Sequence, residues 1–194
     1  KYGTTFVAGD PIVVDVNGDD KISPSDQTKI GSPHPSLIYG GNISLGYKGF
    51  DFNLAFQGVS GNDIFMAWYR TDRSLSNKPA YMYEGRWTSS NTTASLPRAD
   101  NNSDYVYRSD LMVSSGSYMR IKQIQLGYTL SNEITSKFGV SSLRAYISLD
   151  DYFTFTKYKG LDPEAGSNNN LSQGVDRGLY PISAKVLFGL SASF

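Results

Sequence analysis

Ala184-Lys-Val-Leu-Phe-Gly-Leu-Ser-Ala-Ser-Phe194 is the stretch that decides the fold of this chain. Successive side chains of a strand point to opposite faces, so these residues would form one apolar and one mostly polar face. The apolar face would hold Ala184, Val186, Phe188, Leu190, Ala192 and Phe194. The other would hold Lys185, Gly189, Ser191 and Ser193, with Leu187 as the exception. This pattern is typical of a transmembrane β-barrel strand, but a half-buried strand of a soluble β-protein has the same pattern.

Four other segments repeat the alternation, at residues 43–47, 50–57, 123–130 and 143–150. In the second of them the apolar positions are Phe50, Phe52, Leu54 and Phe56. Only Lys48-Gly49 separates the first two segments, which predicts a tight hairpin. The apolar parity of residues 119–122 is opposite to that after Gln123, and we therefore expect a β-bulge there.

The connections between these segments are unequal in length. Residues 48–49 form a tight turn, and residues 131–142 leave room for one helical turn around Glu133-Ile134. By contrast, residues 58–117 and 151–180 form connections far longer than the roughly 15 residues usual in compact domains. Short turns at one end and long loops at the other are typical of outer-membrane barrels, whose long loops lie outside the cell.

The sequence thus predicts an all-β fold of antiparallel transmembrane β-barrel strands. We expect hairpins at 37–57 and 118–150, a terminal strand at 181–194, and a possible further strand at 4–8. Residues 10–36, 58–117 and 151–180 are expected to be external loops.

The composition excludes several other classes of protein. The 18 basic and 18 acidic side chains cancel, so no overall charge indicates nucleic acid as a partner. No run of 18 apolar residues predicts a membrane helix, and the absence of Cys excludes disulfides and thiolate metal sites. The 19 Gly, 14 Tyr and 10 Phe fit turns and interfacial aromatic residues.

Residues 15–26 have the spacing of an EF-hand cation loop. The expected ligands are Asp15, Asn17, Asp19, the backbone carbonyl of Lys21, Ser23 and Asp26. Asp20 replaces the usual Gly, and Asp26 replaces the usual Glu, as in the dockerin-type loops that this segment resembles. We expect Ca²⁺, ahead of Mg²⁺, because the oxygen donors are many and flexible. The alternative is a loop rich in Asx-turns that binds no ion.

Other notable residues have weaker functional interpretations. An aromatic and basic group in the second long loop could contact a ligand or partner, or could pack the loop itself: Trp68, Tyr69, Arg70, Arg73 and Trp87. His34 lacks the second residue that a catalytic or zinc set requires. Nothing beside the carboxylates at 150–151 and 162–164 argues for glycoside hydrolysis, so we do not expect an enzyme.

A series of ordered motifs resembles the C-terminal portion of a SusC/RagA-type TonB-linked outer-membrane transporter of the Bacteroidetes. The match spans nearly the whole chain, and its specificity comes from the order of the motifs. They are Asp15-Val-Asn-Gly-Asp-Asp-Lys-Ile22, Gly31-Ser-Pro-His-Pro35, Tyr47-Lys-Gly-Phe-Asp51, Phe56-Gln-Gly-Val-Ser-Gly-Asn62, Gly85-Arg-Trp-Thr88, Gly116-Ser-Tyr-Met-Arg-Ile-Lys122, Leu126-Gly-Tyr-Thr-Leu130, Tyr158-Lys-Gly-Leu-Asp-Pro-Glu164, Gly174-Val-Asp-Arg-Gly178 and Tyr180-Pro181. Asp150-Asp151-Tyr152-Phe153 departs from the family, which usually has Gln-Asn-Leu-Phe there.

This resemblance implies the last part of a 22-stranded barrel in the bacterial outer membrane. Such transporters import oligosaccharides or peptides, and a SusD-like surface lipoprotein caps the barrel. The TonB complex supplies the energy and acts through an N-terminal part that is absent from these residues. The residues expected to face outer-membrane lipid are Phe50, Phe52, Leu54, Phe56, Phe188, Leu190 and Phe194. One alternative is a secreted soluble β-domain whose dockerin-like Ca²⁺ loop serves as a binding module. Another is a small complete barrel, which would need at least about eight strands.

Overall fold

The computed structural model describes residues 7–72, 77–99, 104–164 and 170–194. The chain divides into two compact units. The first, which we call the loop unit, comprises residues 1–33, 63–114 and 165–179. The second, the sheet unit, comprises residues 34–62, 115–164 and 180–194.

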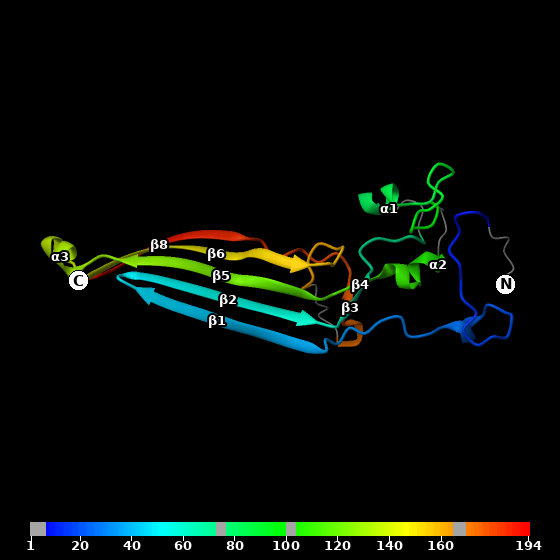
Figure 1. Cartoon of the computed structure of the whole chain (residues 1–194), viewed down its shortest axis with the longest axis horizontal. Helices are drawn as coiled ribbons and strands as arrows, with labels where there is room; N and C mark the ends of the chain where they lie inside the picture. The colour runs from blue at the N-terminus through cyan, green and yellow to red at the C-terminus, as the bar shows by residue number, and fades with distance from the viewer. Residues whose placement is uncertain (1–6, 73–76, 100–103, 165–169) are drawn as a thin grey trace. The chain divides into compact units, whose positions relative to one another are not determined.

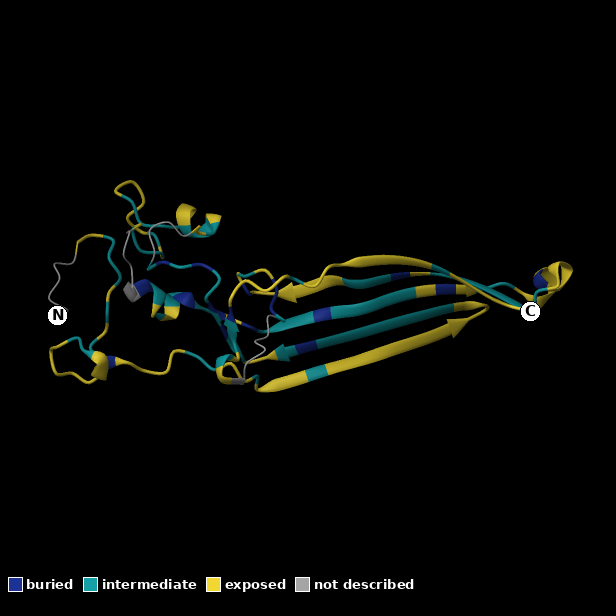
Figure 2. Ribbon diagram, turned by 180° about the vertical axis from the view of Figure 1, so that it is seen from behind, coloured by how far each residue is buried: buried dark blue, intermediate teal, exposed yellow. Residues whose placement is uncertain are grey.

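The sheet unit is a five-stranded antiparallel sheet with the order β1-β2-β5-β6-β8 (Figure 1). Its strands are β1 (Leu37–Tyr47), β2 (Phe50–Ser60), β5 (Tyr118–Thr129), β6 (Ser142–Thr156) and β8 (Lys185–Ser193). Figure 2 shows the two outermost strands, β1 and β8, mostly exposed and the central strands partly covered. The predicted all-β antiparallel fold is confirmed.

Both short connections have the predicted form. Lys48 and Gly49 have φ values of 46° and 86°, as a two-residue hairpin turn of type I′ requires, and Tyr47 pairs with Phe50. Between β5 and β6 lie the helical turn α3 (Asn132–Thr135) and the 3₁₀ turn η3 (Ser136–Phe138). Gly139, with φ of 69°, ends this helical segment.

The predicted bulge is present at Lys122. On the β2 side, Gln123 pairs with Ala55 but Ile121 pairs with Phe56, so Lys122 is an extra residue. On the β6 side, Gln123 pairs with Asp150 and Ile121 with Phe153. Asp151, inside this second irregularity, has φ of 53°. Because of the bulge, the apolar residues before it (Met119 and Ile121) lie on the same face of the sheet as those after it (Ile124, Leu126 and Tyr128).

Several element boundaries differ from those expected. Strand β6 continues to Thr156, well into the segment expected to be a loop from residue 151, because the bulge lets pairing with β5 resume in a shifted register. Strand β2 extends to Ser60, and β8 begins only at Lys185. Of the possible strand at 4–8, residues 4–6 lie outside the described residues, and residues 7 and 8 are not in a strand.

The loop unit has regular structure of its own within all three segments expected to be external loops. A three-stranded sheet has the order β4-β3-β7, in which β3 and β7 are parallel. Its elements are η1 (Pro24–Asp26), β3 (Asp63–Met66), α1 (Ala80–Glu84), α2 (Asp104–Tyr107), η2 (Asp110–Met112), β4 (Val113–Ser115), η4 (Asn170–Ser172) and β7 (Val175–Asp176). The core of the unit contains Ile64, Met66, Tyr69, Val106 and Met112. In the described residues, no helix has the length and apolar character needed to cross a membrane.

Candidate functional site

One face of the sheet unit is apolar across all five strands. The register aligns Leu54 with Ile43 and Ile124, and Ile147 with Leu126 and Phe188. Of the residues expected to face lipid, Phe50, Phe52, Leu54, Phe56, Phe188 and Leu190 lie on this face. Phe188 and Leu190 are 79% and 78% exposed. Phe194, also exposed, follows the end of β8. Their contact with lipid stays a prediction.

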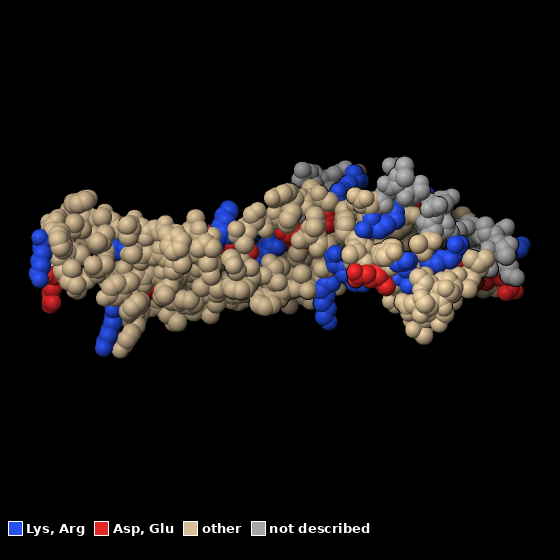
Figure 3. Space-filling model, turned by 90° about the horizontal axis from the view of Figure 1, so that it is seen from above, with Lys and Arg blue, Asp and Glu red and all other residues tan. Residues whose placement is uncertain are grey.

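The opposite face, which we call the inner face, is polar along the same strands. It carries amide and hydroxyl groups, among them the Ser44 hydroxyl, which donates to Asn53 Oδ1 at 2.7 Å. Two charged residues on this face form an ion pair: Arg144 on β6 reaches across β5 and forms two hydrogen bonds to the Asp51 carboxylate on β2. Gly127 lies beneath this pair, where a Cβ would collide with both side chains. Figure 3, which looks from the side that is uppermost in Figure 1, shows few charged side chains along the strands.

The most buried charged group of the inner face centres on Arg120, which is 3% exposed. Its Nη2 atom donates to Asp162 Oδ1 at 2.7 Å, and its Nη1 atom lies 3.2 Å from Glu164 Oε2. The Nε atom donates to the Thr154 hydroxyl at 2.9 Å. Gln57 Nε2 also donates to Glu164, at 3.0 Å. The segment 157–164 is therefore fixed to the inner side of β2, β5 and β6.

Asp162 also fixes the chain just before β8. Its Oδ2 atom accepts the backbone N–H of Ile182 at 2.9 Å, and Oδ1 accepts the N–H of Glu164. Burial acts to raise the pKa of the Asp162 carboxyl, but these two N–H groups and the Arg120 guanidinium together lower it below its usual range. Asp162 is therefore a charged anchor whose two carboxylate oxygens both accept hydrogen bonds.

The predicted cation loop is a series of side chain to backbone turns. Asp15 accepts the N–H groups of Gly18 and Asp20, and both of those residues have positive φ. Asp20 thus adopts the left-handed conformation for which EF-hand loops normally use Gly. Asp26 accepts the N–H groups of Ser23, Val16 and Asn17, which lower the pKa of its carboxyl, the Ser23 bond most of all.

These hydrogen bonds leave the cation prediction untested. Within the residues that the structure describes, no three carboxylates or His side chains are gathered to hold one ion. The backbone donors occupy part of the oxygen capacity of Asp15, Asp19 and Asp26, and each carboxylate oxygen has a further lone pair. The residue types fit a hard cation, whereas their present arrangement is that of the ion-free Asx-turn loop.

The predicted ligand- or partner-binding residues are divided among several contacts of the loop unit. Tyr69 is 2% exposed, and its hydroxyl bonds that of Tyr81 at 3.1 Å; burial raises the pKa of its hydroxyl. The Trp68 ring packs edge-on against Tyr69. Arg70 forms an ion pair with Asp72 and lies 4.4 Å from the centre of the Tyr107 ring.

The other two residues of that set do not join this group. Trp87 lies against Gly9, where an added Cβ would meet its ring. Arg73 lies outside the described residues. The visible contacts are those of residues that pack the loop, and binding to a ligand or partner stays a prediction.

Sequence reasoning missed the ion pairs of the inner face. Arg120 and Asp162 are 42 residues apart, and Arg144 and Asp51 are 93 residues apart. The sequence pattern gives the carboxylates at 162–164 no partner. The alternation of the strands could have predicted these pairs, because it places Asp51, Arg120 and Arg144 on the polar face, where a buried charge requires a partner.

Comparison with known proteins places these features in a family. The chain is 34% identical to the TonB-dependent receptor P3 of Formosa agariphila, over 99% of this chain and 20% of that protein. It is 30% identical to the TonB-dependent receptor SusC of Bacteroides thetaiotaomicron, over 93% of this chain and 17% of SusC. The chain thus spans about a fifth of the length of the curated relatives it matches. No family model matches.

A solved structure gives the same assignment. The structure of the RagAB peptide importer in its open-open state superimposes with a TM-score of 0.72 and 25% identity, over 90% of this chain and 19% of that one. The chain therefore belongs to the SusC/RagA-type TonB-dependent receptors of the outer membrane of Bacteroidetes and forms a segment of their barrel.

Proposed function

We propose that this chain is the barrel wall and loop portion of a TonB-dependent importer that takes up oligosaccharides or peptides together with a SusD-like surface lipoprotein. The observation that carries the proposal is the separation of the two faces of the sheet unit, which the bulge at Lys122 preserves over all five strands. Lipid requires an apolar outer face, and a water-filled lumen favours a polar inner face.

The inner face suits a passage for hydrophilic molecules. Neutral amides and hydroxyls, such as those of Ser44 and Asn53, offer hydrogen bonds to sugar hydroxyls or peptide groups. Several charges of this face lie in ion pairs, Arg144 with Asp51 and Arg120 with Asp162, and pairing weakens the field that each charge creates. Similarity to SusC and to the RagAB peptide importer supports import as the activity.

The two outermost strands favour this proposal over a secreted soluble domain. Strands β1 and β8 each lack a neighbour on one side in the described sheet, and their apolar side chains are exposed. A soluble domain would have to cover these side chains, whereas a larger barrel pairs both edges and places the side chains in lipid.

The function is tested in the native bacterium by deleting the gene and supplying single oligosaccharides or peptides as the nutrient. We expect loss of growth on one class of nutrient, the same loss when TonB is absent, and co-purification of the full-length protein with a surface lipoprotein. Growth and uptake that are unaffected by the deletion on every nutrient would contradict import.

We also propose that the loop 15–26 binds Ca²⁺. The residue types at the ligand positions and the left-handed conformation of Gly18 and Asp20 support this proposal. Bound calcium would hold this loop in a single conformation, with Asp15, Asn17, Asp19, the Lys21 carbonyl, Ser23 and Asp26 as ligands.

A further inference from the structure

The loop unit contains a small pocket with apolar walls and cationic side chains. Its volume is about 110 Å³. Met82, Leu96 and Val106 supply apolar surface, and the charged residues that line it are Lys78, Arg86 and Arg98. All three charged residues are basic, so the pocket has the polarity of an anion site.

Local hydrogen bonds build the pocket from distant parts of the unit. Arg86 and Leu96 face each other in an isolated β-bridge, and the backbone N–H of Trp87 donates to the Leu96 carbonyl at 2.9 Å. Helix α1 supplies Met82 and Tyr83, and Val106 of α2, 3% exposed, closes one wall. Paired backbone groups and apolar side chains, of which Val106 is buried, thus form the walls.

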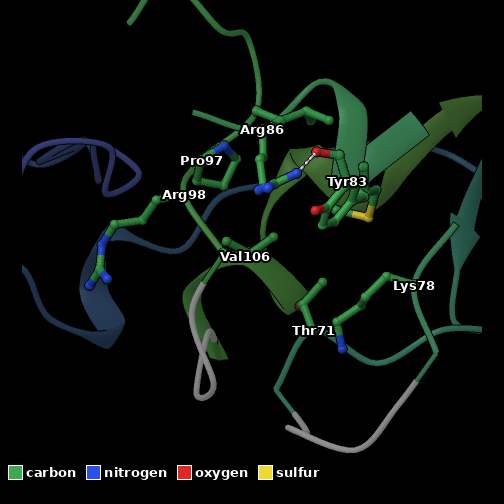
Figure 4. A pocket seen from close by; sticks show the side chains of 10 residues that line it. Thr71, Lys78, Tyr83, Arg86, Pro97, Arg98 and Val106 are labelled. Carbon is green, nitrogen blue, oxygen red and sulfur yellow. Dashed lines mark hydrogen bonds between the residues drawn. The ribbon is translucent and has the colours of Figure 1, made fainter. Parts of the chain in front are cut away.

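The three basic side chains have different roles. Figure 4 shows Arg98 directed away from the pocket, where it forms an ion pair with Asp10. Arg86 stacks on the Tyr83 ring, 3.6 Å from its centre, and donates to the Tyr83 carbonyl. In the part of the chain that the structure describes, Arg86 contacts no carboxylate. Arg86 is therefore the cation available to an incoming anion.

Lys78 adds a second positive charge on another wall. Its amino group donates to the backbone carbonyl of Arg70, and Figure 4 shows it directed toward Thr71. Burial lowers the pKa of the Lys78 amine, an effect that nearby Asp72 opposes. An anion in the pocket would stabilise the charged form of this amine.

We propose that this pocket binds a carboxylate carried on a short apolar body. The planar guanidinium of Arg86 matches a carboxylate with two parallel hydrogen bonds, and the apolar walls accommodate the body. Because whole-ligand pockets are about 300–1,000 Å³, a volume of about 110 Å³ suits a single group the size of one amino-acid side chain. This site does not depend on the proposed import function.

Two sources could supply this chemistry, a free short-chain acid or the terminal carboxylate of a peptide. Binding to the purified full-length protein in detergent is measured by ligand-observed NMR and calorimetry. The ligands are isovalerate, its neutral analogue isovaleramide, and N-acetyl-Ala-Leu with either a free or an amidated terminus. The variants are Arg86→Gln, which removes the charge, Arg86→Lys, which keeps it, and Arg108→Gln, which removes an exposed arginine that does not line the pocket.

We expect at least one carboxylate to bind at least tenfold more tightly than its amide. Arg86→Gln should abolish this preference, Arg86→Lys should keep part of it, and Arg108→Gln should leave it unchanged. Binding of both acids identifies a small acid as sufficient, and binding of the peptide acid alone identifies a chain terminus. Equal binding of acids and amides, binding of neither acid, or a preference that survives Arg86→Gln in a folded protein would overturn the proposal.

Discussion

At the residue scale, Arg120 is the group whose loss should matter most in the sheet unit. It is buried with Asp162 and Glu164, and removing one member of a buried pair typically costs about 3–5 kcal/mol because a charge is left without compensation. We therefore expect Arg120→Gln to release segment 157–164 and to speed tryptic cleavage after Lys157. Lys122→Gln, which removes a more exposed cation that lies 3.9 Å from Glu164, should have a much smaller effect. An unchanged cleavage rate in Arg120→Gln would show that the cluster does not hold this segment.

The cation loop gives a second prediction at this scale. If Ca²⁺ binds, adding it should raise the temperature at which residues 15–26 unfold locally, as measured by hydrogen exchange. The variant Asp15→Asn should need at least tenfold more Ca²⁺ for the same effect. Asp20→Asn, which removes a carboxylate of the same loop outside the predicted ligand set, serves as the control. Exchange that does not respond to Ca²⁺ in the unaltered protein would identify an ion-free Asx-turn loop.

At the element scale, strand β2 makes the two faces directly comparable. Phe52 belongs to the apolar face and Asn53, its neighbour, to the polar face. Arginine on a lipid-facing position near the bilayer midplane costs about 2–4 kcal/mol, whereas lumen positions tolerate charge. We expect Phe52→Arg to reduce assembly into the outer membrane and Asn53→Arg to leave it nearly unchanged, as measured by the amount of heat-modifiable folded protein. Equal yields of the two variants would contradict the assigned faces.

The anchor at Asp162 predicts how the segment before β8 responds to pH. Its pKa is lowered in the folded protein, so its stabilising effect is complete above the ordinary value of 3.8 and is lost as the pH falls through the lowered value. Hydrogen exchange at the Ile182 amide, which donates to Asp162, should therefore stay slow down to about pH 4 and speed up below that relative to the intrinsic rate. Asp162→Asn should remove this pH dependence, and an identical profile in that variant would exclude Asp162 as its cause.

At the scale of the whole molecule, the sequence predicts those features that leave a local periodic signal. The alternation of Phe50, Phe52, Leu54 and Phe56 identifies a strand and its faces, and Lys48-Gly49 identifies the turn. Even the bulge at Lys122 could be predicted, because it inverts the apolar parity.

Features that depend on contacts between distant residues could not be predicted in this way. The continuation of β6 past Asp151 requires a positive φ that the sequence alone does not specify. The Arg120–Asp162 pair and the pocket beside Arg86 join segments whose pairing has no fixed spacing. Such contacts become visible only when the strands and loops are placed in space.

The measurement that tests the central claim most directly is a spin-label scan of strands β2 and β5 in outer membranes. Residues 1–194 contain no Cys, so single cysteines can be introduced without a competing thiol from this segment. Labels at the Phe50, Phe52, Leu54 and Phe56 positions should be relaxed mainly by oxygen, which concentrates in lipid, and those at the intervening positions mainly by a water-soluble nickel chelate. On β5 the lipid-facing positions should be 119 and 121 before the bulge and 124, 126 and 128 after it. That pattern, with its change of phase at Lys122, would establish the barrel wall; uniform exposure to the nickel chelate, or alternation without the phase change, would contradict it.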